Sequence, residues 1–338
     1  MNSLYTTYRP KRWDEVIGQE SVVKILRQQV DTENIFNCMI FAGISGTGKT
    51  TLARIFANEL NKGQGFPIEI DAASNNGVDN VRQITSTASE RSLNSKYKVI
   101  IIDEAHMLSN QAWNAFLKCI EEPPHYTIFI FCTTDPQKIP NTIQNRCMRF
   151  NFTRVPSILI EQKLNYISNS ENFVNYEDVT NYISRICDGE VRKAISYLET
   201  CVRYDSESSI DNALIALGNS SYDNYFKLVN GIIDGNSNLC IEIIDRMYNS
   251  GVDLKKFVDS FTEFCFDILK YILCKDIKAT KIPDSFKDKL DFSICFNDSI
   301  KYYNYIVDKL LSLKNMIKND NNEKLVIEIV FNQISRFV

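Results

Sequence analysis

The side chains with the clearest chemical use lie in the segment FAGISGTGKTT. Its pattern GxxxxGK[ST] is formed by Gly43, Gly48, Lys49 and Thr50. Gly43, Gly46 and Gly48 allow backbone conformations closed to residues with side chains, so that successive N–H groups can converge on a polyphosphate. Lys49 would contact the β- and γ-phosphates, and the Thr50 hydroxyl would bind a Mg²⁺ ion that bridges the same oxygens. The segment therefore predicts a site for a nucleoside triphosphate.

Two carboxylates further along the chain support this prediction. The apolar run VIII at residues 99–102 is typical of a strand buried on both faces, and it ends in Asp103 and Glu104. Ligands of parallel sheets bind at the carboxyl ends of the strands. Asp103 can therefore hold the Mg²⁺ ion, and Glu104 can orient or deprotonate a water molecule for attack on the γ-phosphate. The alternative, a solvated turn, is disfavoured by the phosphate-loop pattern.

Strands and helices alternate around these residues. The apolar segment 38–41 precedes the glycine loop, and a helix that begins near Lys49 adds the positive end of its dipole. Strand character also marks residues 67–71 and 127–132, and helical spacing marks residues 21–30, 78–88 and 110–121. This order predicts an α/β domain in which helices cover both faces of a parallel sheet.

Residues 1–20 leave two alternatives open. Pro10 breaks any helix there, so an extended segment that lies over the nucleotide base fits the sequence. A surface arm fits it equally.

The pattern changes at about residue 155. Residues 157–202 show only short helical segments, and residues 204–209 are polar and typical of a linker. From residue 210 to 338 the spacing of apolar residues is helical throughout, including 254–274. This region predicts a helical bundle that packs against copies of itself.

Composition limits the class of protein. Of 338 residues, 44% are hydrophobic and 24% are charged, which is typical of a globular protein with more than one domain. No apolar run approaches the length of a bilayer span, and residues 1–10 lack the apolar core of a signal peptide. We therefore expect a cytoplasmic protein without membrane contact. A net charge of −4 means that any contact with nucleic acid would be local or shared among subunits.

The ten cysteines are scattered singly, without a CxxC pair, and there are only two histidines. We therefore expect no zinc site and a reduced protein in which most thiols lie in apolar surroundings.

Several motifs together resemble one family. They are YRP at 8–10, VIGQE at 16–20, GISGTGKT at 43–50, EIDAAS at 69–74, IIIDEAHML at 100–108, LKCIEEPP at 117–124 and TTDPQKIPNTIQNRC at 133–147. The chain resembles the γ/τ-type ATPase subunits of bacterial DNA polymerase III clamp loaders, within the AAA+ superfamily. The resemblance is dense from residue 7 to about 198, and beyond that it is one of length and helicity.

The resemblance implies a fold of three domains. They are a P-loop AAA+ ATPase domain at 1–154, a small helical lid domain at 155–205 and an all-helical collar domain at 206–338. Such a subunit would bind ATP and Mg²⁺ and assemble with other clamp-loader subunits in a five-membered spiral. The assembly would place a sliding clamp on primer–template DNA, with ATP hydrolysis triggering release.

The resemblance also assigns roles residue by residue. Thr134 is similar to the residue called sensor 1, Arg192 to the sensor 2 arginine, and Arg146 to the arginine finger presented to a neighbouring subunit. The residues expected to bind the nucleotide are Arg9, Ile17, Gly43, Ser45, Gly46, Thr47, Gly48, Lys49, Thr50 and Thr51.

The chain departs from the family pattern in several places. Residues 61–66 stand where family members usually carry a four-cysteine zinc module, and Asn145 replaces the usual serine before the finger. Asn75 and Gly77 replace basic residues, which leaves Arg82 and Lys118 as the expected DNA contacts. The chain also ends at the collar, so we expect no τ-type extension.

Two other functions remain as alternatives. One is a clamp-loader scaffold subunit that holds nucleotide without hydrolysing it, which Lys49, Glu104 and Arg192 argue against. The other is an AAA+ DNA translocase, which would need a C-terminal DNA-binding module, and the helical tail shows no winged-helix pattern or basic recognition helix.

Overall fold

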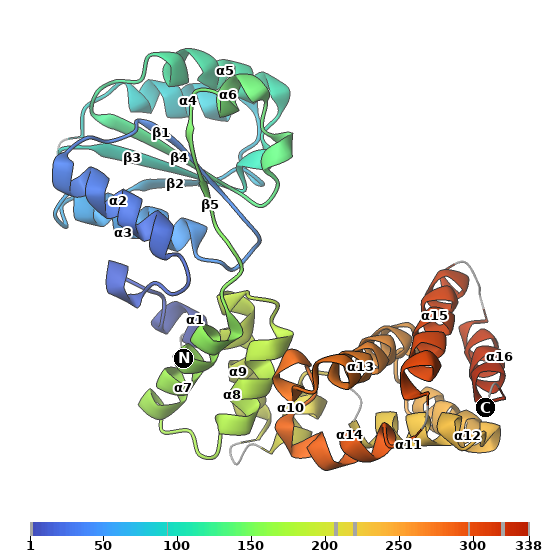
Figure 1. Ribbon diagram of the computed structural model, residues 1–338. Coiled ribbons are helices and arrows are strands. Elements are labelled where there is room, and N and C mark those ends of the chain that lie inside the picture. Colours follow the sequence, from blue (N-terminus) through green and yellow to red (C-terminus); the bar gives the residue numbers. More distant parts are fainter. Residues whose placement is uncertain are drawn as a thin grey trace. The chain divides into compact units, whose positions relative to one another are not determined.

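In the computed structural model, which describes residues 3–92, 94–205, 209–218, 222–296, 298–318 and 322–336, five parallel strands form one sheet (Figure 1). Their order across the sheet is β2-β3-β4-β1-β5. Their bounds are β1 Cys38–Ala42, β2 Ile68–Asp71, β3 Lys98–Asp103, β4 Thr127–Thr133 and β5 Met148–Asn151. The predicted parallel sheet is therefore confirmed. The sequence did not indicate β5, because only Phe150 of this edge strand is buried.

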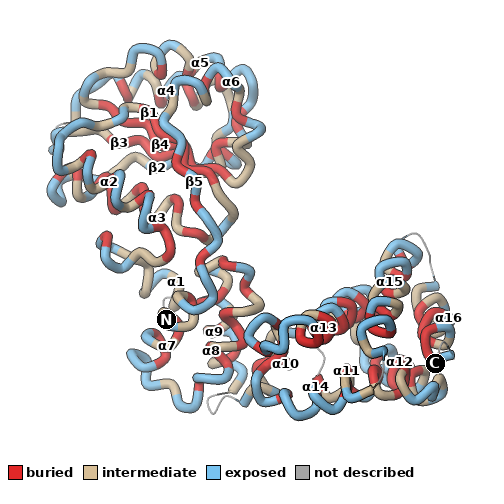
Figure 2. The backbone as a smooth tube through the Cα atoms, viewed as in Figure 1, coloured by how far each residue is buried: buried red, intermediate tan, exposed pale blue. Residues whose placement is uncertain are grey.

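The sheet separates two apolar cores. Along β1, Met39 and Phe41 pack into one core together with helices α2 and α3, whereas Cys38, Ile40 and Ala42 pack into the other core with α4 and α5. This alternation is the two-residue period of a strand. All residues of β1 and β4 are buried, as the red segments of Figure 2 show, which explains their continuous apolar sequences.

The longer helices around the sheet lie where the sequence predicts them. They are α2 Glu20–Thr32, α3 Lys49–Leu60, α4 Val78–Ala88 and α5 Asn110–Glu121. Helix α5 is capped by Ser109, whose hydroxyl accepts a hydrogen bond from the N–H of Ala112 at 3.1 Å.

Short helical elements correct two expectations. Residues 1–20 are not extended throughout, because α1 Leu4–Thr7 and the 3₁₀ turn η1 Trp13–Glu15 lie on either side of Pro10. Residues 136–145, for which the sequence indicates only a loop, contain η3 Pro136–Lys138 and α6 Asn141–Gln144. Prolines favour the first positions of such turns, where a helix needs no N–H donor.

The chain divides into two compact units, Met1–Lys163 with Cys187–Ser196, and Leu164–Ile186 with Tyr197–Val338. The division passes through helices α7 Ser157–Ser170 and α9 Val191–Tyr204. The predicted linker overlaps the end of α9, and its residues 206–208 lie outside the described residues.

The second unit is helical in all its described elements, as expected. Its α-helices are α8 Glu177–Ile186, α10 Ile210–Ala216, α11 Tyr222–Ile233, α12 Ser237–Asn249, α13 Leu254–Cys274, α14 Lys287–Ser293, α15 Ser299–Ile317 and α16 Glu323–Ser335. The 3₁₀ turns η4 Ile277–Ala279 and η5 Asp284–Phe286 connect α13 to α14.

An aromatic core holds this unit together. Helix α13 packs along α15, and α12 and α15 pack against α16. Tyr225, Phe261 and Phe264 lie within 6.2 Å of one another by ring centroids. The buried Arg185 guanidinium of α8 donates hydrogen bonds to the carbonyl oxygens of Ile277 and Ile282, at 3.3 and 3.0 Å, and thereby joins α8 to the same core.

No helix among the described residues is both long enough and apolar enough to cross a membrane.

Candidate nucleotide-binding site

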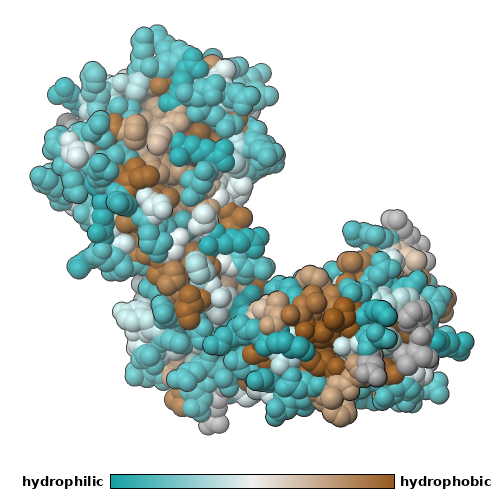
Figure 3. Space-filling model, viewed as in Figure 1, coloured by the Kyte–Doolittle hydropathy of each residue, from teal (hydrophilic) through white to brown (hydrophobic). Residues whose placement is uncertain are grey.

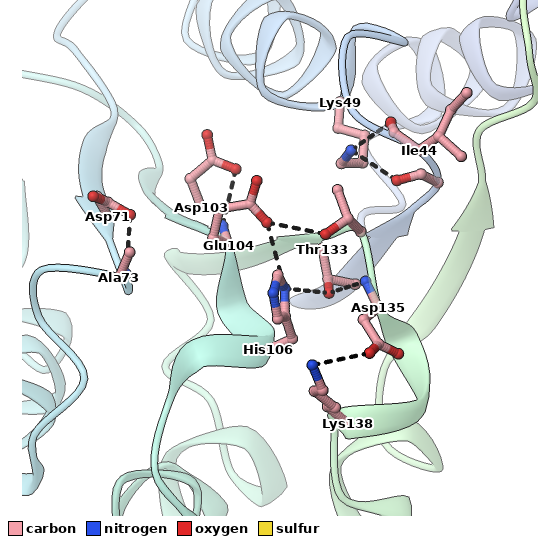
Figure 4. Close-up of polar contacts among 12 residues, drawn as sticks. Ile44, Lys49, Asp71, Ala73, Asp103, Glu104, His106, Thr133, Asp135 and Lys138 are labelled. Atoms are coloured by element: carbon pink, nitrogen blue, oxygen red, sulfur yellow. Dashed lines mark hydrogen bonds and ion pairs between the residues drawn. The ribbon is translucent and has the colours of Figure 1, made fainter. Parts of the chain in front are cut away.

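Lys49 lies at the start of α3 with its side chain inside the glycine loop (Figure 4). The residue is 7% exposed, and its ammonium group donates hydrogen bonds to the carbonyl oxygens of Gly43 and Ile44 at 2.8 and 2.9 Å. Burial lowers the pKa of Lys49, while attraction to the carboxylates of Glu104 and Asp103 opposes that shift. The loop thus holds a cation that has lost most of its water, which strengthens its attraction for a phosphate.

The glycines of the loop serve different purposes. Gly46 and Gly48 have φ values of +70° and +98°, which side chains rarely allow, as predicted. The same expectation is wrong for Gly43, which is absent from the glycines with positive φ. A Cβ atom at Gly43 would lie 2.5 Å from the carbonyl oxygen of Phe152, so this glycine is needed because a second backbone segment passes close by.

The two predicted Mg²⁺ ligands meet at the carboxyl end of β3. The Thr50 hydroxyl donates a hydrogen bond to Oδ2 of Asp103 at 2.8 Å. Both groups are oxygen donors, which Mg²⁺ prefers, and they lie in the cavity beside the glycine loop. The two side chains therefore fit a Mg²⁺ ion that is also bound by phosphate oxygens.

Glu104 follows in a left-handed backbone conformation, with φ 46° and ψ 42°. The hydroxyl of Thr134, directly after the neighbouring strand β4, donates a hydrogen bond to Oε2 of Glu104 at 3.3 Å. Nδ1 of His106 lies 3.4 Å from the same oxygen (Figure 4). A carboxylate with defined partners is thus presented at the edge of the sheet where the glycine loop lies.

The N-terminal segment forms part of the cavity wall. Nε of Arg9 donates a hydrogen bond to the Thr51 hydroxyl at 3.1 Å, and burial lowers the pKa of Arg9. Gln19, from the VIGQE motif, is buried and donates a hydrogen bond to the carbonyl oxygen of Thr153 at 2.8 Å. The segment is therefore fixed to the body of the unit, which argues against a free surface arm.

Arg192 lies in the first turn of α9 and over the ring of Tyr5, with 4.4 Å between its guanidinium carbon and the ring centroid. A Cβ atom at Gly46 would lie 3.3 Å from Cβ of Arg192. The start of α9 therefore packs directly against the glycine loop.

Twelve predicted residues line one cavity within the first unit. They are Arg9, Ile17, Ser45, Gly46, Thr47, Gly48, Lys49, Thr50, Thr51, Asp103, Glu104 and Arg192. Gly43 contributes its carbonyl oxygen to Lys49, and Thr134 contacts Glu104, but neither lines the cavity.

The remaining predicted residues lie elsewhere. Arg146 forms an ion pair with Glu121 at 2.7 Å and donates a hydrogen bond to the Thr142 carbonyl oxygen. Arg82 is exposed on α4 and pairs with Asp79, and Lys118 is exposed on α5. Within the described residues, no group of three or more His, Cys, Asp or Glu side chains is placed to hold a metal ion.

Sequence reasoning missed several residues of the site. Tyr5, Tyr8 and Lys163 line the cavity, and burial lowers the pKa of Lys163 while Glu15 opposes that shift. His106 stands two positions after Glu104 within the motif IIIDEAHML at 100–108. This closeness to Glu104 was the sequence signal that could have identified it. No sequence signal marked Tyr5 or Lys163, because tertiary packing determines where the helices that carry them lie relative to the glycine loop.

Comparison with known proteins points to one group of relatives. A family model described as "DNA polymerase III, delta subunit" matches residues 66–156. The chain is 34% identical over 312 residues to DNA polymerase III subunit tau of Bacillus subtilis, which covers 85% of this chain and 55% of that protein. It is 31% identical over 298 residues to the gamma/tau subunit of Mycoplasma genitalium, covering 81% and 50%. The chain thus spans about half the length of the curated relatives it matches.

Solved structures show the same fold. The RuvB Holliday junction branch migration motor of Thermotoga maritima matches with a TM-score of 0.53 and 21% identity, covering 67% of this chain and 80% of that one. At this identity the match shows the fold alone, and it agrees with the predicted α/β fold of the AAA+ type.

Proposed function

Because the chain belongs to the family of DNA polymerase III gamma/tau subunits, we propose that it is an ATP-dependent clamp-loader subunit that helps to place a sliding clamp on primer–template DNA during replication. One observation carries the proposal: the buried Lys49, the Thr50–Asp103 pair and the Glu104 carboxylate all meet in one cavity. A scaffold that only held nucleotide would not need Glu104 there.

The cavity residues would have different roles in ATP hydrolysis. Lys49 would neutralise charge on the β- and γ-phosphates, while Glu104 would orient the attacking water and accept its proton. Thr50 and Asp103 would hold Mg²⁺, which would supply positive charge to the phosphate oxygens. Ser45, Gly46, Thr47 and Gly48 would surround the phosphates with backbone N–H groups.

Other residues would report which nucleotide is bound. Thr134 contacts Glu104, and Arg192 enters the cavity from the start of α9, so both can respond to the γ-phosphate. Arg9, Ile17 and Thr51 would contact the rest of the nucleotide. ATP in place of ADP would therefore change the position of α9, which continues beyond the first unit.

Assembly with other clamp-loader subunits in a five-membered arrangement, which the family resemblance implies, is part of the proposal. Arg146 would act in trans on the site of a neighbouring subunit. Apolar side chains gather on the surface of the helical unit over α13 (Figure 3), and the α13 residues Phe266 and Leu273 are exposed. Such a surface suits contacts with another subunit. The domain limits 1–154, 155–205 and 206–338 also follow from the family resemblance and are part of the proposal.

Arg82 and Lys118 remain the proposed DNA contacts. They are exposed on the neighbouring helices α4 and α5, which suits contact with phosphates. The expectations of a zinc-free protein and of a cytoplasmic location also remain predictions.

Replacement of Lys49 tests the nucleotide site. Lys49→Ala should abolish ATP hydrolysis and weaken Mg²⁺–ATP binding, because the desolvated cation is lost. Equilibrium binding of a fluorescent ATP analogue and a phosphate-release assay would measure both effects. Lys62→Ala is a matched control, since Lys62 follows α3 and does not line the cavity. Equal hydrolysis by Lys49→Ala and the wild-type protein would contradict the assignment.

A further inference from the structure

His106 lies beside Glu104, but the proposed mechanism of ATP hydrolysis gives it no role. It is one of two histidines in the chain, and its side chain is only 13% exposed. It lies in the turn η2 Ala105–Met107, directly after Glu104.

The local backbone brings its ring back toward the Glu104 carboxylate. Glu104 has a left-handed conformation, and its carbonyl oxygen accepts a hydrogen bond from the N–H of Met107 at 2.8 Å, which closes a tight turn. Nδ1 of His106 consequently lies 3.4 Å from Oε2 of Glu104. Non-glycine residues in this conformation cluster at functional sites, where the surroundings must hold them.

Thr133 contacts the same ring nitrogen. Its hydroxyl oxygen accepts a hydrogen bond from the N–H of Asp135 at 3.0 Å and lies 3.2 Å from Nδ1 of His106 (Figure 4). Thr133 ends the buried strand β4 and is itself fully buried, so it is a rigid anchor. His106 thus connects the end of β4 to the carboxylate that follows β3.

The neighbours of Nδ1 favour one tautomer of this ring. An ionised carboxylate oxygen only accepts, so contact with Oε2 is attractive when Nδ1 carries hydrogen. The Thr133 hydroxyl oxygen can accept from the same N–H, because a hydroxyl has two lone pairs. The Nδ1–H tautomer therefore satisfies both neighbours.

The two oxygens of Glu104 consequently differ. Oε2 faces the Thr134 hydroxyl and Nδ1 of His106, whereas Oε1 makes no hydrogen bond to any residue that the structure describes. We infer that His106, anchored by Thr133, is a positioning residue that holds Oε2 of Glu104 and thereby leaves Oε1 to orient the attacking water. This inference rests on the proposed ATP hydrolysis.

A purely structural role, in which His106 only packs η2 against β4, predicts different behaviour from two substitutions. In His106→Asn the side-chain amide nitrogen stands near the position of Nδ1 and keeps a donor. In His106→Leu the volume is retained approximately and the donor is lost. A packing role would favour leucine at least as much as asparagine, whereas a positioning role favours asparagine.

The test measures ATP hydrolysis under saturating ATP, ATP affinity and thermal midpoint for the full chain in its purified complex. We expect His106→Leu to lower kcat by roughly tenfold to a hundredfold, as loss of a supporting polar contact does in other active sites, with unchanged ATP affinity. His106→Asn should recover most of that loss. His125→Asn, at the exposed second histidine, is the matched control and should behave as wild type.

Two further variants test whether His106 acts together with Thr133 and through Glu104. Thr133→Val should lower kcat in the same direction, and the double variant with His106→Leu should be no slower than His106→Leu alone, because both act through one contact. Glu104→Gln distinguishes a failure of the proposed function from a failure of the role inferred for His106. If Glu104→Gln hydrolyses ATP normally, the proposed function fails. If Glu104→Gln is inactive while His106→Leu keeps the wild-type kcat, or if asparagine recovers nothing, only the role of His106 is overturned.

Discussion

Glu104 is the residue on which the proposed ATP hydrolysis depends most. Its left-handed backbone, its contact with Thr134 and its position directly after Asp103 all direct one carboxylate to the edge of the sheet. A residue held in a sparsely populated conformation requires support from its surroundings, which the turn η2 and the end of β4 supply here.

Replacement of this carboxylate should separate binding from hydrolysis. Glu104→Gln keeps the shape of the side chain and removes the base, so we expect normal ATP binding with hydrolysis reduced by roughly 10²- to 10⁴-fold. Retention of radiolabelled ATP during a chase with unlabelled nucleotide would show the trapped state. Glu122→Gln, an exposed acid beyond the end of α5, is the control. If the glutamine variant turns over ATP at the wild-type rate, the base lies elsewhere.

The placement of single residues could be predicted from sequence where a motif fixes the spacing. Lys49 and Asp103 belong to two short patterns, and the structure brings both into one cavity. The role of Gly43 could not be predicted correctly, because it depends on Phe152, which is more than 100 residues away in sequence. Tyr5 was missed for the same reason, since its contact with Arg192 joins distant parts of the chain.

At the scale of elements, the site depends on how closely β1 and the segment after β5 approach each other. The N–H of Phe152 donates a hydrogen bond to the carbonyl oxygen of Ala42 at 2.7 Å, immediately before the glycine loop begins. This contact sets the position from which the loop reaches α3.

Gly43→Ala tests this close approach. Its Cβ would overlap the Phe152 carbonyl oxygen, a backbone atom that cannot move freely, so we expect a loss of stability of about 1–3 kcal/mol. Both tryptophans, Trp13 and Trp113, lie in the first unit, so tryptophan fluorescence during urea unfolding reports on that unit.

The matched control is Gly77→Ala, where φ is −81° and a Cβ would meet nothing within 4 Å. It should change stability by less than about 0.5 kcal/mol. Equal stability of the two variants would show that the loop tolerates a side chain beside Phe152.

Elements with a long periodic pattern were predicted well, whereas short ones were not. The bounds of α4, α5 and α13 agree with the sequence pattern, because each buries one apolar stripe. The strand β5 and helix α6 have four residues each and bury one residue apiece, so neither produces a recognisable period.

At the scale of the whole molecule, Arg146 connects the fold to the proposed assembly. Within the chain it pairs with Glu121, and the side chains of Arg146 and Glu121 are 39% and 46% exposed. Such an exposed ion pair contributes only about 0–1 kcal/mol to stability, so the arginine can leave it without harm to the fold. The sequence of one chain could not establish the role of Arg146, because the roles of residues at a subunit boundary depend on a second chain.

Arg146→Ala should bind ATP almost normally and lose hydrolysis that requires the assembled complex. An arginine that stabilises charge on the γ-phosphate from a neighbouring subunit can contribute roughly 10³- to 10⁵-fold in other nucleotide hydrolases. A subunit with intact Arg146 and Lys49→Ala should then rescue the site of an Arg146→Ala neighbour that it faces. Arg149→Ala, an exposed arginine on β5, is the control.

The most direct test of a clamp-loader subunit is the rate of ATP hydrolysis by its purified complex, measured with and without sliding clamp and primer–template DNA, for wild type and Arg146→Ala. We predict that clamp and DNA together stimulate the wild-type complex, that Arg146→Ala abolishes this stimulation, and that mixing with the Lys49→Ala subunit restores it. A wild-type complex whose hydrolysis does not respond to clamp and DNA, and which Arg146→Ala leaves unchanged, would contradict the account.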